Sequence, residues 1–151
     1  MIYDANIDGW GAKDFHRCCD KKGWTLTIVE TKSKGLFGGS CFIFGGFTTA
    51  EWESSRIYKP CAHSFLFSVN EGSKYPIRRG DREAIYCNSD WCAAFGVGGD
   101  ELRICSDSNN NTYSYCYANG GSFKLPAAKG SKEPSINGGE HNFQLKQFEV
   151  Y

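Results

Sequence analysis

The sequence predicts a mainly β fold in which short strands are joined by glycine-containing turns. Aromatic residues, which favour strands, are frequent, with 11 Phe, 8 Tyr and 4 Trp among 151 residues. The chain also contains 18 glycines, and it has no long run of the helix formers Ala, Leu, Glu and Lys. Several segments alternate between apolar and polar residues, which is the periodicity of a half-buried strand. At this length we expect a single domain, residues 1–151, with one core.

The segment 91–108 is the stretch around which we expect the fold to be organised. Three glycines within residues 96–99 precede the alternating pair Leu102 and Ile104. Glycine permits positive φ angles and close backbone approach, so a bent segment leading into a core strand is expected. The glycines match neither a Walker A loop, which needs Gly-Lys-Ser/Thr, nor a dinucleotide fingerprint, which needs a third spaced glycine and a helix. A structural role is therefore favoured over phosphate binding.

The first third of the chain contains one predicted helix and one clearly alternating strand. A helix is expected over 12–20, because apolar side chains fall on one face and Gly23 after two lysines is a stop signal. In the strand predicted over 24–31, Leu26 and Ile28 alternate with threonines, as in a half-buried strand. Residues 53–60 are predicted to form a polar loop.

The later strands are predicted from the same alternation. A strand over 63–69 is apolar on both faces, which predicts an internal position, whereas Pro76 predicts that the strand over 74–77 lies at an edge. Near the C-terminus the apolar residues change phase between Leu145 and Phe148, which predicts a β-bulge. Further strands are predicted at 2–3, 84–87 and 113–117.

A short repeat leaves the register of one hairpin undecided. Leu-Phe-Gly-Gly at 36–39 is nearly repeated as Ile-Phe-Gly-Gly at 43–46, so either copy can take the paired register. We favour a local duplication without a function of its own.

The charge distribution argues against nucleic acid and anionic membranes as partners. The 17 Lys and Arg residues balance the 17 Asp and Glu residues, and the largest basic cluster is the pair Arg78 and Arg79. No run of 18 apolar residues occurs, and no basic and then apolar leader follows Met1. We therefore expect an intracellular, cytoplasmic monomer that does not insert into membranes.

The eight cysteines are irregularly spaced and contain no C-x-x-C pair, which favours reduced thiols that act as small apolar fillers. A zinc site that combines cysteines with His16, His63 or His141 remains an alternative, although paired ligand spacing is lacking. Cys18 and Cys19 are the best candidates for reactive thiols, because three basic residues lie nearby. They also fall on the helix face that is predicted to be buried.

No recognisable catalytic motif is present. Nucleophilic catalysis needs a base within hydrogen-bond reach, but the chain has neither a G-x-S-x-G elbow nor a known cysteine signature. Glu140, His141 and Glu149 are candidate acid–base groups, and residues 107–111 offer oxygen ligands for calcium without the EF-hand pattern. His16 is a candidate base or ligand, but a surface or satisfied histidine is favoured. We name no catalytic, cofactor-binding or metal-binding residue.

Six segments in the same order resemble the TLDc domain family. They are the segments 2–31, 43–52, 58–69, 74–77, 95–104 and 138–151. Together they cover nearly the whole chain, and no single one of them would be sufficient. Two features depart from the family pattern. The doubled Phe-Gly-Gly lengthens the connection before Phe47, and Asp-Glu-Leu at 100–102 carries one residue more than the usual sequence of glycine, aspartate and an apolar residue, which puts the direction of the Asp100 side chain in question.

The resemblance implies an α+β, mainly β fold in which two antiparallel sheets pack as a β-sandwich with a few short helices. It also implies protection against oxidative stress and, in several family members, binding and regulation of the vacuolar proton-pumping ATPase. We therefore expect a non-enzymatic protein-interaction domain without a cofactor. A domain excised from a longer protein is also compatible with the resemblance. The alternative is an uncharacterised enzyme or a thiol-based antioxidant with a site in a loop cleft.

Overall fold

The computed structural model describes residues 1–33, 39–99, 101–117, 121–127, 129–130 and 135–151. The first Phe-Gly-Gly copy falls mostly outside the described residues, as does Asp100. The second copy is paired: β3 (Ile43–Thr48) aligns with β2 (Thr25–Thr31), with Ile28 opposite Gly45. The question of which register the first copy takes therefore stays outside the described part of the chain.

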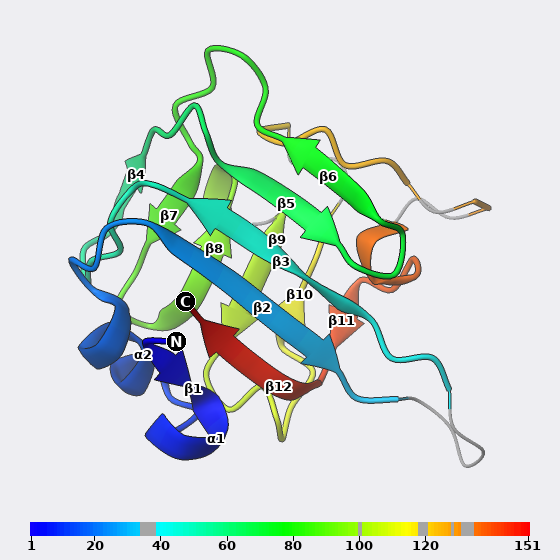
Figure 1. Cartoon of the computed structure of the whole chain (residues 1–151), viewed down its shortest axis with the longest axis horizontal. Coiled ribbons are helices and arrows are strands. Elements are labelled where there is room, and N and C mark those ends of the chain that lie inside the picture. Colours follow the sequence, from blue (N-terminus) through cyan, green and yellow to red (C-terminus); the bar gives the residue numbers. More distant parts are fainter. Residues whose placement is uncertain (34–38, 100, 118–120, 128, 131–134) are drawn as a thin grey trace.

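Two antiparallel six-stranded sheets pack face to face, which confirms the predicted β-sandwich (Figure 1). The first sheet has the order β1-β12-β2-β3-β5-β6, and the second has the order β11-β10-β9-β8-β7-β4. The remaining strands of the first sheet are β1 (Tyr3–Asp4), β12 (Leu145–Val150), β5 (Phe65–Ser68) and β6 (Ser73–Pro76). The second sheet contains β4 (Ile57–Lys59), β7 (Ile85–Cys87), β8 (Trp91–Phe95), β9 (Leu102–Cys105), β10 (Ser114–Tyr115) and β11 (Asn142–Phe143).

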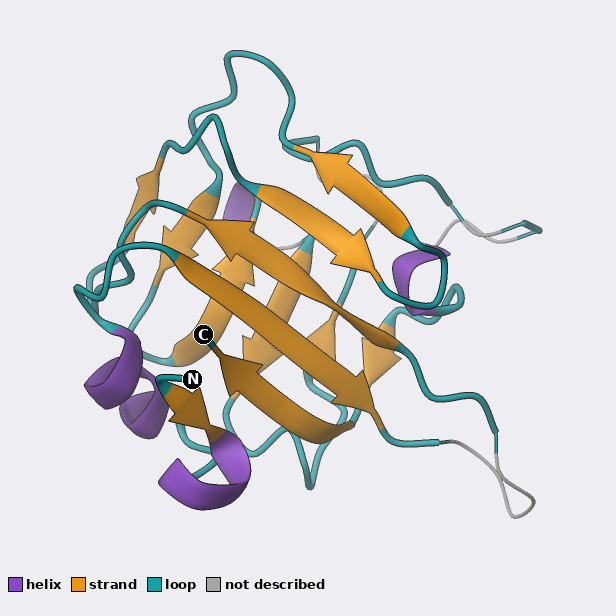
Figure 2. Ribbon diagram, in the orientation of Figure 1, coloured by secondary structure: helices purple, strands orange, loops and turns teal. Residues whose placement is uncertain are grey.

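The helices are short, as predicted, and α1 (Ala5–Asp8) and α2 (Ala12–Cys19) lie together at one end of the sandwich (Figure 2). Two 3₁₀ turns, η1 (Val97–Gly99) and η2 (Ser135–Asn137), occupy connections. The predicted helix over 12–20 is thus confirmed. Helix α1 was not predicted, because a single turn carries no periodic signal.

The strand predictions are confirmed for most of the chain, with one correction. β5 is internal between β3 and β6, and β6 forms an edge of the first sheet. The predicted loop over 53–60 is wrong in part, because it contains β4, a three-residue edge strand that pairs with β7. Ile57 and Tyr58 are both exposed, so β4 lacks the alternation that reveals a half-buried strand.

The C-terminal segment links the two sheets. β11 belongs to the second sheet and β12 to the first, so the chain changes layers at Gln144. The pairing of β12 with β2 is irregular between Leu145 and Gln147, which confirms the predicted bulge. The change of apolar phase therefore reflects a strand that turns from one layer to the other.

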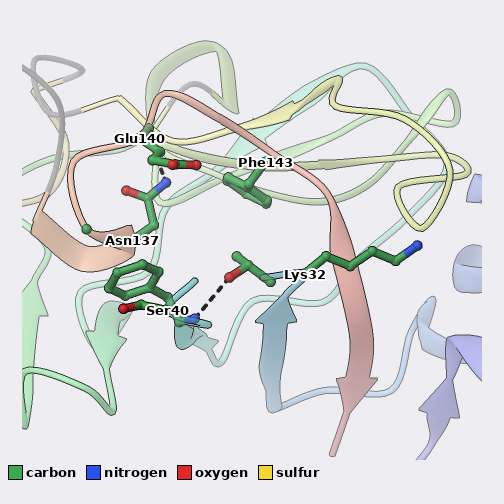
Figure 3. Close-up of a pocket in the computed structure, with 8 residues that line it drawn as sticks. Lys32, Ser40, Asn137, Glu140 and Phe143 are labelled. Carbon is green, nitrogen blue, oxygen red and sulfur yellow. Dashed lines mark hydrogen bonds between the residues drawn. The ribbon is translucent and has the colours of Figure 1, made fainter. Parts of the chain in front are cut away.

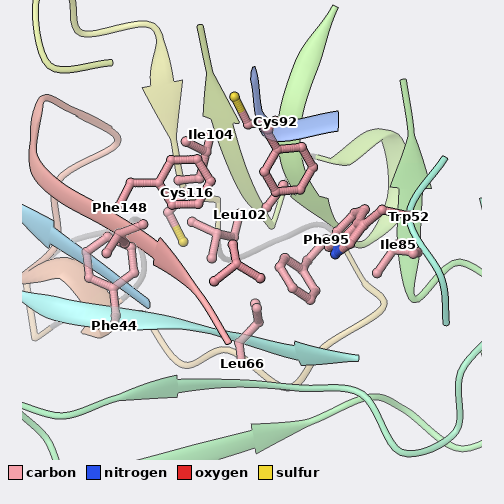
Figure 4. Close-up of a cluster of buried hydrophobic side chains, with 14 of the residues drawn as sticks. Phe44, Trp52, Leu66, Ile85, Cys92, Phe95, Leu102, Ile104, Cys116 and Phe148 are labelled. Atoms are coloured by element: carbon pink, nitrogen blue, oxygen red, sulfur yellow. The ribbon is translucent and has the colours of Figure 1, made fainter. Parts of the chain in front are cut away.

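The core lies between the sheets and is rich in aromatic side chains (Figure 4). Trp52 is fully buried and contacts Phe95 edge to face, with 5.4 Å between the ring centroids. Gly46 allows this packing, because a Cβ atom there would lie 2.6 Å from the Phe95 ring. Glycine in β3 therefore lets an aromatic ring of the second sheet reach the backbone of the first.

Candidate interaction surface

In its first four residues, strand β2 places threonines in the core and apolar side chains on the outside, whereas beyond them Val29 is buried and Glu30 lies on the outer face. Thr25 and Thr27 are buried, whereas Leu26 and Ile28 are only half-buried on the outer face of the first sheet. Trp52 Nε1 donates a hydrogen bond of 3.0 Å to Thr25 Oγ1. The predicted alternation is confirmed. Over residues 25–28, however, the threonines face the core and the apolar residues face outward, which is the reverse of an ordinary half-buried strand. An exposed apolar face of this kind is typical of a surface that binds another molecule.

Neighbouring strands extend this apolar outer face. In the sheet register, Leu26 lies opposite Phe47, which lies opposite Phe65 on β5. Phe67 lies opposite Gly45, and a Cβ atom on that glycine would lie 3.1 Å from the Phe67 ring. We call this surface the outer apolar face, and its members are Trp24, Leu26, Ile28, Ile43, Phe47, Phe65, Phe67 and Val69.

The aromatic side chains of the outer apolar face are held by one another. Phe47 and Phe65 stack with centroids 5.1 Å apart, and Trp24 meets Phe47 edge to face at 6.3 Å. Trp24 is nevertheless 73% exposed. Lys74 lies over the Phe65 ring, 3.9 Å from its centroid, at the β6 side of the face. Such pre-ordered aromatic side chains lose little further conformational freedom on binding.

The outer apolar face is acidic at its β12 side, which is the side away from β6. A cavity of about 160 Å³ is lined by Ile28, Ile43, Gln147 and the carboxylates of Glu30 and Glu149. Glu30 is paired with Lys146 at 2.8 Å. Glu149 accepts hydrogen bonds from Gln147 and Tyr151, and it has no cationic partner among the described residues. The cavity therefore combines an apolar floor with a carboxylate that is free to pair with a cation.

The outer face of the second sheet carries a different set of side chains. The guanidinium of Arg103 lies between two rings, 3.4 Å from the Trp91 centroid and 4.6 Å from the Tyr115 centroid. Tyr115 stacks in turn on His141, with 5.4 Å between the centroids. Arg103 also donates to the Gly98 carbonyl at 2.7 Å. The arginine is therefore held within its own domain rather than presented to a partner.

The glycines of the segment 96–99 have the conformational role that was predicted. Gly96 and Gly98 adopt positive φ angles of 85° and 66°. A Cβ atom on Gly96 would lie 1.8 Å from Glu101 Oε2, so the glycine makes room for a fully buried carboxylate. The Phe123 amide donates to Glu101 Oε1 at 2.7 Å. Burial raises the pKa of Glu101 to about 7, although the Phe123 amide lowers it.

His16 is a satisfied structural histidine, as favoured from the sequence. It is buried, and its Nδ1 lies 2.6 Å from Asp20 Oδ1. Its Nε2 lies 2.9 Å from the carbonyl oxygens of both Asn88 and Trp91. The ring thus ties α2 to the β7–β8 connection. Both nitrogens are engaged, which leaves no ring atom to serve as a base or a ligand.

The structure contradicts the choice of Cys18 and Cys19 as reactive thiols. Burial and the nearby carboxylate of Asp8 raise the pKa of Cys18 more than Arg17 lowers it. Burial also raises the pKa of Cys19, which is fully buried. Both thiols are therefore less ionised than an ordinary cysteine. Local basic sequence was a poor guide because burial has the larger effect.

The three candidate acid–base residues do not converge. Glu140 lines a cavity of about 250 Å³ with Asn137 and Phe143, and Lys32 points away from it to donate to the Asn109 carbonyl (Figure 3). His141 stacks on Tyr115 at the second sheet instead. Glu149 lies at the edge of the outer apolar face.

The described residues contain no group of three or more His, Cys, Asp or Glu side chains that is able to hold a metal ion. In the segment 107–111, Asn111 donates to the carbonyls of Ser106 and Asp107, and its own amide oxygen accepts from Tyr113. The loop thus uses its polar groups to hold its own backbone. All eight cysteines are free thiols.

The family model of the TLDc domain matches residues 1–151, which is the whole chain. The chain belongs to the TLDc domain family. A search of curated proteins found no match. In this TLDc domain, the outer apolar face and the Glu149 cavity are the features that sequence reasoning missed. Alternation in β2 showed that its two faces differ, but it did not show which of them is turned to the core.

Proposed function

We propose that this TLDc domain is a non-enzymatic protein-interaction module that docks on the vacuolar proton-pumping ATPase. The single observation that carries the interaction class is the outer apolar face, because β2 presents Leu26 and Ile28 outward while it buries threonines. Family membership supports the choice of the ATPase as partner. The proposal includes a cytoplasmic location and a role in protection against oxidative stress.

The chemistry of the face specifies the kind of segment that fits it. Apolar side chains of a partner would cover the stacked Phe47 and Phe65 rings, where Trp24 offers its exposed indole. A lysine or arginine of the partner would lay its aliphatic stem on Ile28 and pair with Glu149. Aromatic anchors surrounded by weaker contacts are the usual source of affinity in protein interfaces.

The candidate acid–base residues lie at different features of the molecule. Glu140 and Glu149 line different cavities, His141 stacks on Tyr115, and the ring nitrogens of His16 are both engaged. In addition, no described helix is both long and apolar enough to cross a membrane.

The test is co-sedimentation of the purified domain with intact ATPase on vesicles, scored with ATP hydrolysis and release of the soluble sector. The double variant Leu26→Thr/Ile28→Thr places β-branched residues, which favour strands, at both positions but removes apolar surface, and we expect at least about tenfold weaker binding. Ile7→Thr is the matched control, since Ile7 is 78% exposed on α1, away from the face. We expect it to bind like the wild type.

Each outcome bears on a different part of the proposal. Saturable binding that both variants retain would disprove the role of the outer apolar face. Absence of binding by the wild-type domain would reject the ATPase as its partner. Glu149→Gln should weaken binding and flatten its dependence on salt, because it removes the carboxylate that pairs with the partner's cation.

A further inference from the structure

A cationic cavity lies beside an unusual cysteine at the β6 side of the sandwich. The cavity measures about 430 Å³ and is lined by Cys61, Arg78, Arg79, Asp81 and Lys124. The side chains of the three cations form no hydrogen bond or ion pair with any described residue. Cations therefore outnumber the single carboxylate, and they are available to an anionic ligand.

Cys61 is one of the residues that line this cavity, and its thiol is held by hydrogen bonds. Thr49 Oγ1 lies 3.1 Å from Cys61 Sγ, and the Thr49 amide donates to the same sulfur at 3.4 Å. Cys61 is only 7% exposed, and burial raises the pKa of its thiol. The Ser64 and Thr49 hydroxyls and two backbone amides outweigh burial and lower this pKa to about 6.

We propose that Cys61 is a site of thiol–disulfide exchange with a small, carboxylate-bearing disulfide that the cavity's cations hold. The Cys61 thiolate attacks one sulfur of the disulfide, so one S–S bond breaks and a new S–S bond forms to Cys61. Cys61 is oxidised, the departing half is reduced, and that half leaves as a thiolate that takes a proton from water. Arginine is well suited to bind carboxylates, because its donors match their geometry.

The other cysteines lack this combination. Burial raises the pKa of Cys18, Cys19, Cys87, Cys92 and Cys105. Cys41 is exposed and serves as an internal comparison, because it lines none of the cavities described above. The inference is independent of the proposed ATPase binding, since Cys61 is not part of the outer apolar face.

The reactivity advantage of a thiol with a lowered pKa depends on the pH, and it is larger at pH 6 than at pH 7. At pH 6 about half of a thiol with a pKa of about 6 is ionised, against roughly 0.1% of a thiol at the usual value of 9.0. The less basic thiolate is intrinsically roughly 20-fold less nucleophilic, so a net advantage of about 20-fold remains. At pH 7 the same arithmetic leaves only about fourfold.

The experiment treats the folded domain with glutathione disulfide at pH 5 to 8 and locates the mixed disulfide by peptide mass spectrometry. We expect modification of Cys61 ahead of Cys41 at pH 6, with a Cys61 rate that is half-maximal near pH 6. Urea-unfolded protein is the control, and its Cys61 should lose this pH profile. Preferential modification of Cys41 at pH 6, or a Cys61 rate that follows the unfolded profile, would refute the proposal.

A second arm tests the cations. The wild type should prefer glutathione disulfide over the uncharged hydroxyethyl disulfide, and the triple variant Arg78→Gln/Arg79→Gln/Lys124→Gln should lose about tenfold of this preference at low salt. These residues are exposed, so we expect the variant to fold. Thr49→Val should shift the half-maximal pH upward without changing the preference. An unchanged preference in the triple variant would overturn the cationic part of the site.

Discussion

Thr25 and Thr27 of β2 provide the sharpest test of how this strand buries threonines in the core. Thr25 and Thr27 share the inner face and are both almost fully buried, but their hydroxyls differ in what they meet. Thr25 Oγ1 accepts from the indole of Trp52. Thr27 Oγ1 finds no hydrogen-bond partner among the described residues. Valine has nearly the same shape as threonine, so Thr→Val at each position isolates the hydroxyl.

The two substitutions should have opposite signs. Thr27→Val removes a buried, unpaired hydroxyl and should stabilise the domain by about 1 kcal/mol. Thr25→Val leaves the buried Trp52 N–H without its acceptor and should destabilise the domain by about 2 kcal/mol. The difference between the variants is thus about 3 kcal/mol, although the chemical change is identical.

The measurement is urea unfolding followed by tryptophan fluorescence, with the free energy of unfolding obtained by linear extrapolation. In a domain of this size, each 1 kcal/mol corresponds to a shift of about 3 °C in Tm, so thermal unfolding provides a second readout. If Thr27→Val destabilises the domain as much as Thr25→Val does, the assignment of a satisfied and an unsatisfied hydroxyl is wrong.

Three further predictions concern other sites. The pKa of Glu101 is raised from 4.5 to about 7, so its contribution to stability is fully present below pH 4.5 and is lost as pH rises through 7. Urea unfolding from pH 4.5 to 8 should show the wild type losing about 3 kcal/mol relative to Glu101→Gln; parallel curves would contradict this. Gly46→Ala should cost about 1–3 kcal/mol, because its Cβ would meet the Phe95 ring at 2.6 Å; an unchanged urea midpoint would disprove the clash. Arg103→Met should reduce the near-ultraviolet circular dichroism of the rings around it while ATPase binding is retained, because the guanidinium contacts only its own domain; lost binding would move the interface to the second sheet.

The sequence predicted those elements whose signal is repeated over several residues. Helix α2, the internal strand β5 and the bulge before β12 were all expected, because apolar periodicity marks them. Helix α1 and strand β4 escaped notice, since four and three residues are too few to show a period. For the same reason the exact ends of the predicted strands differ from the observed ends.

The candidate sites were harder to predict than the fold, because they depend on contacts between distant segments. Cys61 owes its lowered pKa to Ser64 nearby and also to Thr49, which is 12 residues away in the chain and which no spacing motif links to Cys61. Cys18 sits beside Arg17, yet burial and Asp8 have the larger effect. The buried Glu101 was likewise hidden, because neighbouring acidic residues in a glycine-rich segment are usually solvated.

The register of β2 explains why the domain keeps an apolar outer face at all. A slip of one residue would turn Leu26 and Ile28 into the core, where burial of each side chain would contribute about 2 kcal/mol, but it would also turn Val29 outward and the charged Glu30 inward. Hydrogen bonds from Trp52 to Thr25 and from the Phe42 amide to Thr31 oppose that slip, because both would be lost. Polar anchors in the core thus fix which face turns outward. The strand gives up apolar burial to present Leu26 and Ile28, and binding of a partner would recover that burial.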